Sequence, residues 1–212
     1  MKAKILCGNR NLPAQLLETA NDDHWIGVDR GALILIQHDI TPKLAVGDFD
    51  SVTDKERMLL VETLNVNPVE AEKDDTDLAL AIAEAIDAGY DDIEIYGATG
   101  ARLDHFMGAL QILEKPEYHQ GNVNLRIIDA QNEIQYLPQG QHIVSRDESY
   151  QYVSFIPVIY PVTITLQHFK YELFNQTLAL GSTLTVSNEL NEERGKVIID
   201  NGSLLMIKSK DA

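Results

Sequence analysis

Two aspartates in the stretch GDFDS, Asp48 and Asp50, are spaced so that they could hold a cation together. In an extended backbone, residues i and i+2 point to the same side, so the two carboxylates would converge. Carboxylates that close repel each other, and their oxygens are the hard ligands that suit Mg²⁺ bridging to phosphate. The other interpretation is that Asp50 or Ser51 caps the helix that follows, which is a common use of both residue types.

A second acidic stretch, EKDDTDLALA, places Asp74, Asp75 and Asp77 at the amino end of the most apolar predicted helix. The helix dipole favours negative charge there, but capping needs one such residue and not three. We therefore expect at least one of the three to join Asp48 and Asp50 around the same cation. A solvated acidic turn is the alternative that this pattern leaves open.

The stretch GATGARLDH has the residue types that bind phosphate groups. Gly97 and Gly100 stand at the entrance to a predicted helix, where small residues let backbone N–H groups reach an anion. Arg102 could add a charged fork. Asp104 could contact a ribose or base, or serve as an ordinary first-turn acid. Because no G-x-x-x-x-G-K-[ST] stretch occurs, the combination indicates phosphoryl chemistry without a Walker loop.

These stretches follow predicted β-strands in the first 129 residues. Strand-like and helix-like patterns alternate there, which is typical of a parallel sheet covered by helices. Ligands of such sheets sit beyond the carboxyl ends of the strands, so Asp29 and Arg30 in GVDRGA, after the second strand, are further candidates. Expected strands cover 3–9, 25–29, 43–48, 66–71, 91–98 and 124–129, and expected helices cover 11–20, 30–39, 51–64, 77–89 and 101–115.

The remaining residues, 130–212, have no helical period and are rich in β-branched, aromatic and turn residues. Such a pattern predicts a small antiparallel sandwich or barrel. The chain is therefore expected to form two domains. The first, 1–129, is an α/β domain with a Rossmann-like, mostly parallel sheet and helices on both faces, and the second, 130–212, is all-β. Expected strands in the second domain cover 133–138, 140–146, 150–159, 161–169, 180–187, 196–202 and 203–209.

Composition limits the possible partners. Seventeen Lys and Arg against 33 Asp and Glu give a net charge of −16, which repels nucleic acid and anionic membrane surfaces. The longest nearly uncharged run, Leu78 to Ile86, is far too short to span a bilayer. A single cysteine, Cys7, cannot form an intramolecular disulfide, and nothing reads as a signal peptide, so a cytoplasmic location is expected. Cys7 itself is expected to be a buried structural residue.

Four motifs in this order, GDFDS, KDDTDLALA, GATGARLDH and TLTVSNE, resemble the thiamine pyrophosphokinase family, and the resemblance covers essentially the whole chain. It implies that the α/β domain binds ATP and Mg²⁺ and transfers the terminal pyrophosphoryl group to the hydroxyl of thiamine, releasing AMP. It also implies a homodimer, in which the β domain of one subunit completes the thiamine site of the other.

The resemblance implies a role for individual residues. Asp48, Asp50 and Asp77 would be metal ligands and catalytic residues, and Asp77 would also meet the thiamine hydroxyl. The nucleotide would be bound by Asp29, Arg30, Asp74, Thr76, Gly97, Gly100, Arg102 and Asp104. Thiamine would be contacted by Tyr171, whose ring would lie against it, and by Ser187 and Asn188.

The sequence departs from the family pattern at two positions. Ala101 stands where GATGGRLDH has a second glycine, which reduces backbone freedom in the phosphate loop, and Glu72 stands where an aspartate commonly opens the acidic run. Two other functions remain possible on the residues alone. One is an Mg-dependent diphosphokinase for another small alcohol, and the other is a nucleotide or thiamine sensor without turnover.

Overall fold

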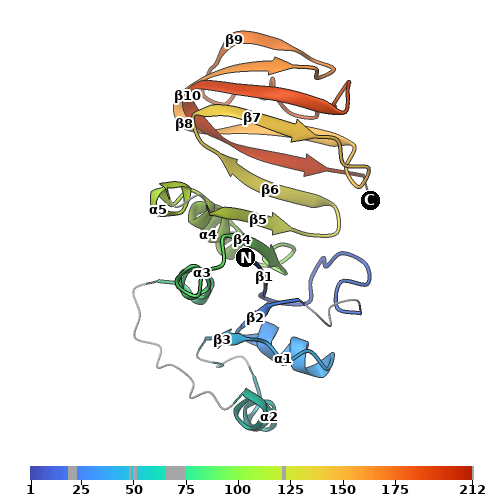
Figure 1. Cartoon of the computed structure of the whole chain (residues 1–212), viewed down its shortest axis with the longest axis vertical. Coiled ribbons are helices and arrows are strands. Elements are labelled where there is room, and N and C mark those ends of the chain that lie inside the picture. The colour runs from blue at the N-terminus through green and yellow to red at the C-terminus, as the bar shows by residue number, and fades with distance from the viewer. Residues whose placement is uncertain (19–22, 48, 50–51, 65–74, 121–122, 212) are drawn as a thin grey trace. The chain divides into compact units, whose positions relative to one another are not determined.

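A computed structural model shows how the chain folds (Figure 1). The chain divides into two compact units, Met1–Ala130 and Gln131–Ala212. No helix in the described part of the chain is long and apolar enough to cross a membrane. The strand expected at 66–71 and the site residues Asp48, Asp50 and Asp74 lie outside the described residues. Those are 1–18, 23–47, 49, 52–64, 75–120 and 123–211.

The first unit contains parallel strands that lie side by side in the order β3-β2-β1-β4-β5. Each neighbouring pair in this series is parallel. Their bounds are β1 Lys2–Leu6, β2 Trp25–Val28, β3 Leu44–Val46, β4 Asp92–Tyr96 and β5 Asn124–Ile128. The strands are rich in Ile, Val and Leu and are largely buried, as expected for strands covered by helices.

Helices in the first unit pack their apolar residues on these strands. In α3, Ala79, Ile82 and Ala85 recur at helical spacing and are buried. This helix contacts β3, β2 and β1, while α1 contacts β2 and β1. The bounds are α1 Arg30–Gln37, α2 Asp54–Leu64, α3 Asp77–Asp87, α4 Leu103–Leu113 and α5 Pro116–Gln120.

The helix predicted for 11–20 is wrong over the residues described there, which end at 18. Asn11 and Gln15 have φ values of 50° and 59°, in the left-handed region that a helix interior excludes. The segment forms single turns instead. Its apolar residues Leu12, Leu16 and Leu17 are partly buried and pack against the core cluster that contains Trp25, without helical geometry.

The described residues of the second unit form antiparallel strands, which Figure 1 colours from yellow to red. The central strand, β10, pairs with β8 along most of its length, with β7 through 194–199 and with β6 through 204–209. The β8 strand also pairs with β9. The bounds are β6 Asn132–Leu137, β7 Gly140–Ser145, β8 Tyr152–Gln167, β9 Leu173–Leu178 and β10 Arg194–Ser209.

The predicted β-runs correspond only partly to these strands. The runs at 150–159 and 161–169 are one strand, β8, and the last two runs are one strand, β10. Register shifts in the β8–β10 pairing near Asn201 explain why the turn-like residues there do not end a strand. Residues 180–187 form turns and no named strand, and β9 arises in a segment where none was predicted.

Candidate active site

The carboxyl ends of β1 and β4 approach each other so closely that only glycine fits. Gly97 has a φ of 72°, and a β-carbon there would lie 2.2 Å from the carbonyl oxygen of Gly8. The backbone N–H of Cys7 donates to the carbonyl of Tyr96 at 2.9 Å, which ties the two strand ends together. The glycine of the GATG stretch is therefore required by backbone geometry, as well as being suited to an anion.

The next residues of the GATG stretch, Thr99 and Gly100, contact Asp129 and Asn11. Gly100 has a φ of 75°, and a β-carbon there would lie 2.7 Å from Nδ2 of Asn11. The carbonyl of Asn11 accepts the N–H of Ala130 at 2.7 Å, and the buried hydroxyl of Thr99 donates to buried Asp129 at 2.8 Å. The sequence patterns did not point to Thr99 or Asp129, although Asp129 ends a predicted strand, as Asp29 and Asp48 do.

Asp29 lies against the first residue of the GDFDS turn. Its N–H donates to the carbonyl of Val46 at 2.9 Å, and it has a φ of 47°. A β-carbon on Gly47, whose φ is 140°, would come within 2.1 Å of the Asp29 Oδ1 atom. The structure thus brings Asp29 to the point where the acidic turn leaves β3.

The thiol of Cys7, at the end of β1, is affected by the negative charge of Asp29. Burial, with a smaller contribution from the Asp29 carboxylate, raises the pKa of the Cys7 thiol to about 12. The raised pKa keeps the thiol protonated at neutral pH and makes it a poor nucleophile, while its exposure is intermediate and not the burial expected from the sequence.

The residue between the two aspartates of GDFDS is fixed by the surrounding helices. Phe49 is 3% exposed and packs with Leu33 of α1 and Leu60 of α2. Its φ is 54°, and its carbonyl accepts a hydrogen bond from Arg57 Nη2 of α2 at 3.0 Å. The backbone at the centre of the acidic turn is therefore held by a buried ring and by one cation.

The start of α2 also connects to Arg30. Thr53 and Glu56 form a capping box: the Thr53 N–H donates to Glu56 at 2.8 Å and the Glu56 N–H donates to the Thr53 hydroxyl at 3.4 Å. The hydrogen bonds that the Thr53 N–H and the Thr53 hydroxyl donate to the Glu56 carboxylate, at 2.8 and 2.9 Å, lower the pKa of Glu56, and the charge of Arg30 lowers it more weakly. Arg30 Nη2 lies 3.9 Å from Glu56, and its side chain is 55% exposed.

Asp77 occupies the first turn of α3, where the Thr76 hydroxyl caps the helix by accepting the Ala79 N–H at 3.3 Å. Asp75 is paired with Lys115 at 2.8 Å. Within the described ranges, no three His, Cys, Asp or Glu side chains gather as metal ligands would. Of the three predicted ligands, only Asp77 falls within those ranges.

Arg102 and Asp104 form an exposed bidentate pair at the start of α4. Arg102 Nε and Nη2 donate to the two carboxylate oxygens at 3.1 and 2.5 Å. The two side chains are 70% and 65% exposed. Chiefly through the hydrogen bonds from Arg102, the pKa of Asp104 is lowered to about 2. A phosphate that binds Arg102 would have to share this guanidinium with Asp104.

In the second unit, Tyr171 presents an aromatic ring to the surface. The side chain is 57% exposed. The Lys170 ammonium lies 5.6 Å from the ring centroid and 2.6 Å from the Glu189 carboxylate. The ring is therefore available to a ligand, with one cation already near it.

Asn188 lies beside Tyr171, and Ser187, its neighbour in sequence, differs from it in exposure. Ser187 is exposed and has a φ of 57°, and its N–H donates to the Ser154 hydroxyl at 2.9 Å. Asn188 is 3% exposed, and its side-chain amide bonds to the backbone of Tyr171 and Glu189. The structure thus brings Tyr171 and Asn188 into contact across 17 residues of sequence.

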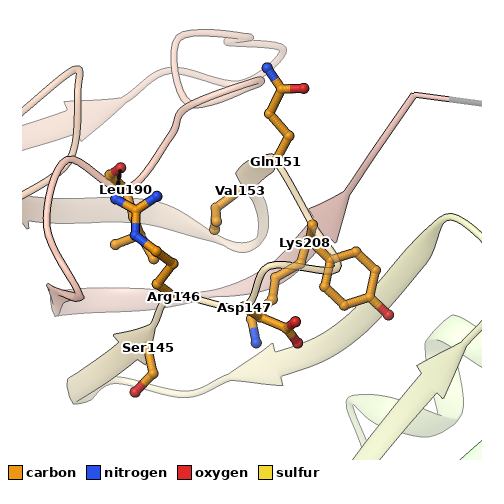
Figure 2. Close-up of a pocket in the computed structure, with 8 residues that line it drawn as sticks. Ser145, Arg146, Asp147, Gln151, Val153, Leu190 and Lys208 are labelled. Carbon is orange, nitrogen blue, oxygen red and sulfur yellow. Dashed lines mark hydrogen bonds between the residues drawn. The ribbon is translucent and has the colours of Figure 1, made fainter.

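A pocket in the second unit is shown in Figure 2. Its cavity volume of about 20 Å³ is enough for about one water molecule. Arg146 donates to the Leu190 carbonyl at 2.8 Å, and Lys208 pairs with Glu133 at 3.0 Å, so both cations are engaged. The predicted site residues that the structure describes are not among its lining residues, which are Ser145, Arg146, Asp147, Tyr150, Gln151, Val153, Leu190 and Lys208.

Comparison with known proteins gives the same family for both units. Residues 15–125 match the family described as "Thiamin pyrophosphokinase, catalytic domain", and residues 141–204 match "Thiamin pyrophosphokinase, vitamin B1 binding domain". The chain is 44% identical over 194 residues to thiamine pyrophosphokinase of Bacillus subtilis (strain 168), covering 90% of each chain.

Solved structures agree with this match. A probable thiamine pyrophosphokinase from Staphylococcus saprophyticus is 50% identical, with a TM-score of 0.81 and full coverage of both chains. The structure of thiamine pyrophosphokinase from Bacillus subtilis is 41% identical, with a TM-score of 0.89 and full coverage of both chains. The chain therefore belongs to the thiamine pyrophosphokinase family.

Proposed function

We propose that this chain transfers the pyrophosphoryl group of ATP, bound with Mg²⁺, to the hydroxyl of thiamine, giving thiamine diphosphate and AMP. The observation that carries the proposal is the close approach of the strand ends at Gly8 and Gly97, with Asp29 at the end of a neighbouring strand. The chain that has this arrangement is similar over its length to a thiamine pyrophosphokinase. Residues 1–129, as a Rossmann-like domain, would bind ATP and Mg²⁺. Residues 130–212, as a β-sandwich, would bind thiamine and form the dimer.

The donor set of the first unit fits Mg²⁺. Carboxylate oxygens are its preferred protein ligands, and we assign Asp48, Asp50 and Asp77 to it. The carboxylate of Asp29 lies against Gly47, and its charge contributes to the raised pKa of Cys7, so this strand end already favours a cation. Bound Mg²⁺ would neutralise phosphate oxygens of ATP during transfer.

The reaction is an in-line attack by the hydroxyl oxygen of thiamine on the β-phosphorus of ATP. A bond forms between that oxygen and the β-phosphorus, and the bond from the β-phosphorus to the oxygen of the α-phosphate breaks, so AMP leaves. Asp77 orients the hydroxyl and accepts its proton late in the step. Arg102 and the backbone N–H groups near Gly97 and Gly100 contact the phosphates.

The remaining nucleotide contacts are assigned from the motifs that carry the family resemblance. Thr76, which caps α3, stands directly before Asp77 in the acidic motif. Arg30 follows Asp29 at the end of β2. The full set of proposed nucleotide residues is Asp29, Arg30, Asp74, Thr76, Gly97, Gly100, Arg102 and Asp104.

Thiamine is a cation, so a protein with a net charge of −16 attracts it. The exposed ring of Tyr171 would hold it by stacking and cation–π contact, worth about 0.5–2 kcal/mol. Ser187, which is exposed and directly precedes Asn188, is assigned as a polar contact, and Asn188 belongs to the same site.

A homodimer is supported by apolar side chains on the surface of the second unit. Phe174 is 86% exposed, Leu180 85% and Leu184 57%. These side chains are the candidates for an apolar surface that another chain covers. We propose that a second copy covers them and completes the thiamine site.

Incubation of the purified protein with thiamine, ATP and Mg²⁺, with AMP, ADP and thiamine diphosphate all quantified, tests the proposal. Equal amounts of AMP and thiamine diphosphate are expected. AMP formed with another small alcohol but not with thiamine would favour a different diphosphokinase. Binding of thiamine or ATP without any nucleotide breakdown would favour a sensor.

A further inference from the structure

We propose that Asn188 is a positioning residue, whose amide clamps the backbone of Tyr171 and thereby fixes the ring against which thiamine lies. The inference rests on the proposed function, because it concerns how the thiamine-binding ring is held. It changes the role that the family resemblance implies for Asn188, from a residue that touches thiamine to one that acts through Tyr171.

The clamp uses both polar backbone groups of Tyr171. Asn188 Oδ1 accepts the Tyr171 N–H at 3.0 Å, and Asn188 Nδ2 donates to the Tyr171 carbonyl at 2.8 Å. The same oxygen accepts the Glu189 N–H at 2.9 Å. Both lone pairs of the amide oxygen are therefore used within the protein, and one of the two amide hydrogens is used as well.

Asn188 is itself anchored to a long strand. Its N–H donates to the Val153 carbonyl at 3.1 Å, and its carbonyl accepts the Val153 N–H at 2.8 Å. Val153 is part of β8, and it pairs with Lys208 of β10. Asn188 thus holds the backbone of Tyr171 in a fixed position relative to β8.

Tyr171 needs such a clamp because it lies in the connection between β8, which ends at Gln167, and β9, which begins at Leu173. Its own side chain is more than half exposed and cannot hold the backbone by burial. A ring whose backbone is already ordered loses less conformational entropy when a ligand stacks on it. The effect of Asn188 on thiamine binding therefore passes through the ring of Tyr171.

A double-mutant cycle of Asn188→Ala and Tyr171→Ala tests this route. Asn188→Ala alone should raise the thiamine KM by about tenfold, with less than about twofold change in the KM for ATP. In the Tyr171→Ala background, the same change should add less than about twofold, since residues that act as a unit are not additive. If the fold-rise in thiamine KM of the double variant equals the product of the two single-variant rises, Asn188 contacts thiamine itself and the proposal is overturned.

A matched control distinguishes loss of the Asn188–Tyr171 hydrogen bonds from a general loss of stability around Asn188. The Thr185 hydroxyl is buried and donates to the Phe155 carbonyl, so Thr185→Val removes a buried hydrogen bond nearby that does not involve Tyr171. It should lower Tm as Asn188→Ala does and leave the thiamine KM unchanged. An equal rise in KM in Thr185→Val would contradict the clamp.

Two further measurements keep the test decisive. If Asn188→Ala does not fold, Asn188→Asp retains the two acceptor bonds, loses the donor bond, and should give a smaller rise with the same non-additivity. If the parent protein forms no thiamine diphosphate, the proposed function fails, and the cycle is then measured as thiamine Kd by calorimetry. Additive losses of affinity, or no thiamine binding by the parent protein, would overturn the clamp as well.

Discussion

Close contacts and a nearby carboxylate determine how individual residues behave at the strand ends. Gly97 is required because the carbonyl of Gly8 leaves no room for a side chain, and Asp29 is positioned by the same kind of close contact with Gly47. Cys7, in the same region, has a raised pKa because it is partly buried and close to a carboxylate. The thiol is therefore not a reactive group of this region.

The thiol gives a prediction about alkaline stability. The folded Cys7 has a pKa of about 12, whereas an unfolded thiol titrates near 8.5. Its contribution to stability is full below the unfolded value and is lost as the pH rises toward the folded one, because only the unfolded chain releases the proton. The loss is at most about 1.4 kcal/mol per pH unit. Urea unfolding at pH 8 and pH 10 should show a steeper loss in the parent than in Cys7→Ala, and equal slopes would contradict the assignment.

Asp50 gives a prediction about turnover. Asp50→Asn should reduce formation of thiamine diphosphate by roughly a hundredfold or more, because a metal-ligand charge is removed. The fold should be unchanged by circular dichroism. Asp39→Asn is the matched control, since Asp39 is exposed after α1 and its φ of 60° suits asparagine. Activity near that of the parent in Asp50→Asn would exclude Asp50 as a ligand.

At the scale of elements, α2 fixes the backbone between the two aspartates of GDFDS. The ring of Phe49 is buried between α1 and α2, and Arg57 holds its carbonyl. The capping box of Thr53 and Glu56 defines where the helix begins. The charges of GDFDS belong to its aspartates, and α2 sets the position of Phe49 between them.

Arg57→Met removes the donor to Phe49 and keeps a long apolar side chain. Loss of one such hydrogen bond, about 1 kcal/mol, should raise the Mg²⁺ concentration for half-maximal activity about fivefold. The thiamine KM should not change, because Tyr171 belongs to the other unit. Lys55→Met, an exposed position on the same helix, should behave as the parent does. An unchanged Mg²⁺ requirement in Arg57→Met would mean that α2 does not position the metal ligands.

The elements also show what the sequence could predict. Alternating patterns placed the parallel strands and α1 to α4 within a few residues, because each element buries a periodic apolar face. The helix predicted for 11–20 does not form over residues 11–18, because the backbone at Asn11 and Gln15 is left-handed, which the residue types there did not indicate. The role of Asn188 could not be read from the sequence, because its partner, Tyr171, depends on the pairing of segments far apart in the chain.

At the scale of the whole molecule, a net charge of −16 favours a cationic substrate and disfavours a polyanion. ATP is anionic, so in the proposed reaction local cations and N–H groups must offset this field where the nucleotide would bind. The acidic turns with Mg²⁺ are suited to do so. The two units thus have different tasks in the proposed reaction, with phosphates bound by one and the thiamine ring by the other.

A substitution at Phe174, an apolar residue that is 86% exposed, tests the proposed homodimer. If a second copy covers Phe174, Phe174→Asp should shift the protein toward monomer in analytical ultracentrifugation and raise the thiamine KM. Met58→Asp, a change at a 62% exposed residue of α2, should leave the mass unchanged, because the proposed dimer contacts lie in residues 130–212. A parent protein that sediments as a monomer would contradict the proposed homodimer.

In the proposed reaction, two phosphates move together from ATP to thiamine. ATP labelled at its β-phosphate distinguishes this reaction from transfer of one phosphoryl group. The label is expected in thiamine diphosphate, with unlabelled AMP as the other product. Label retained in ADP, or in ATP that stays intact beside thiamine, would contradict it.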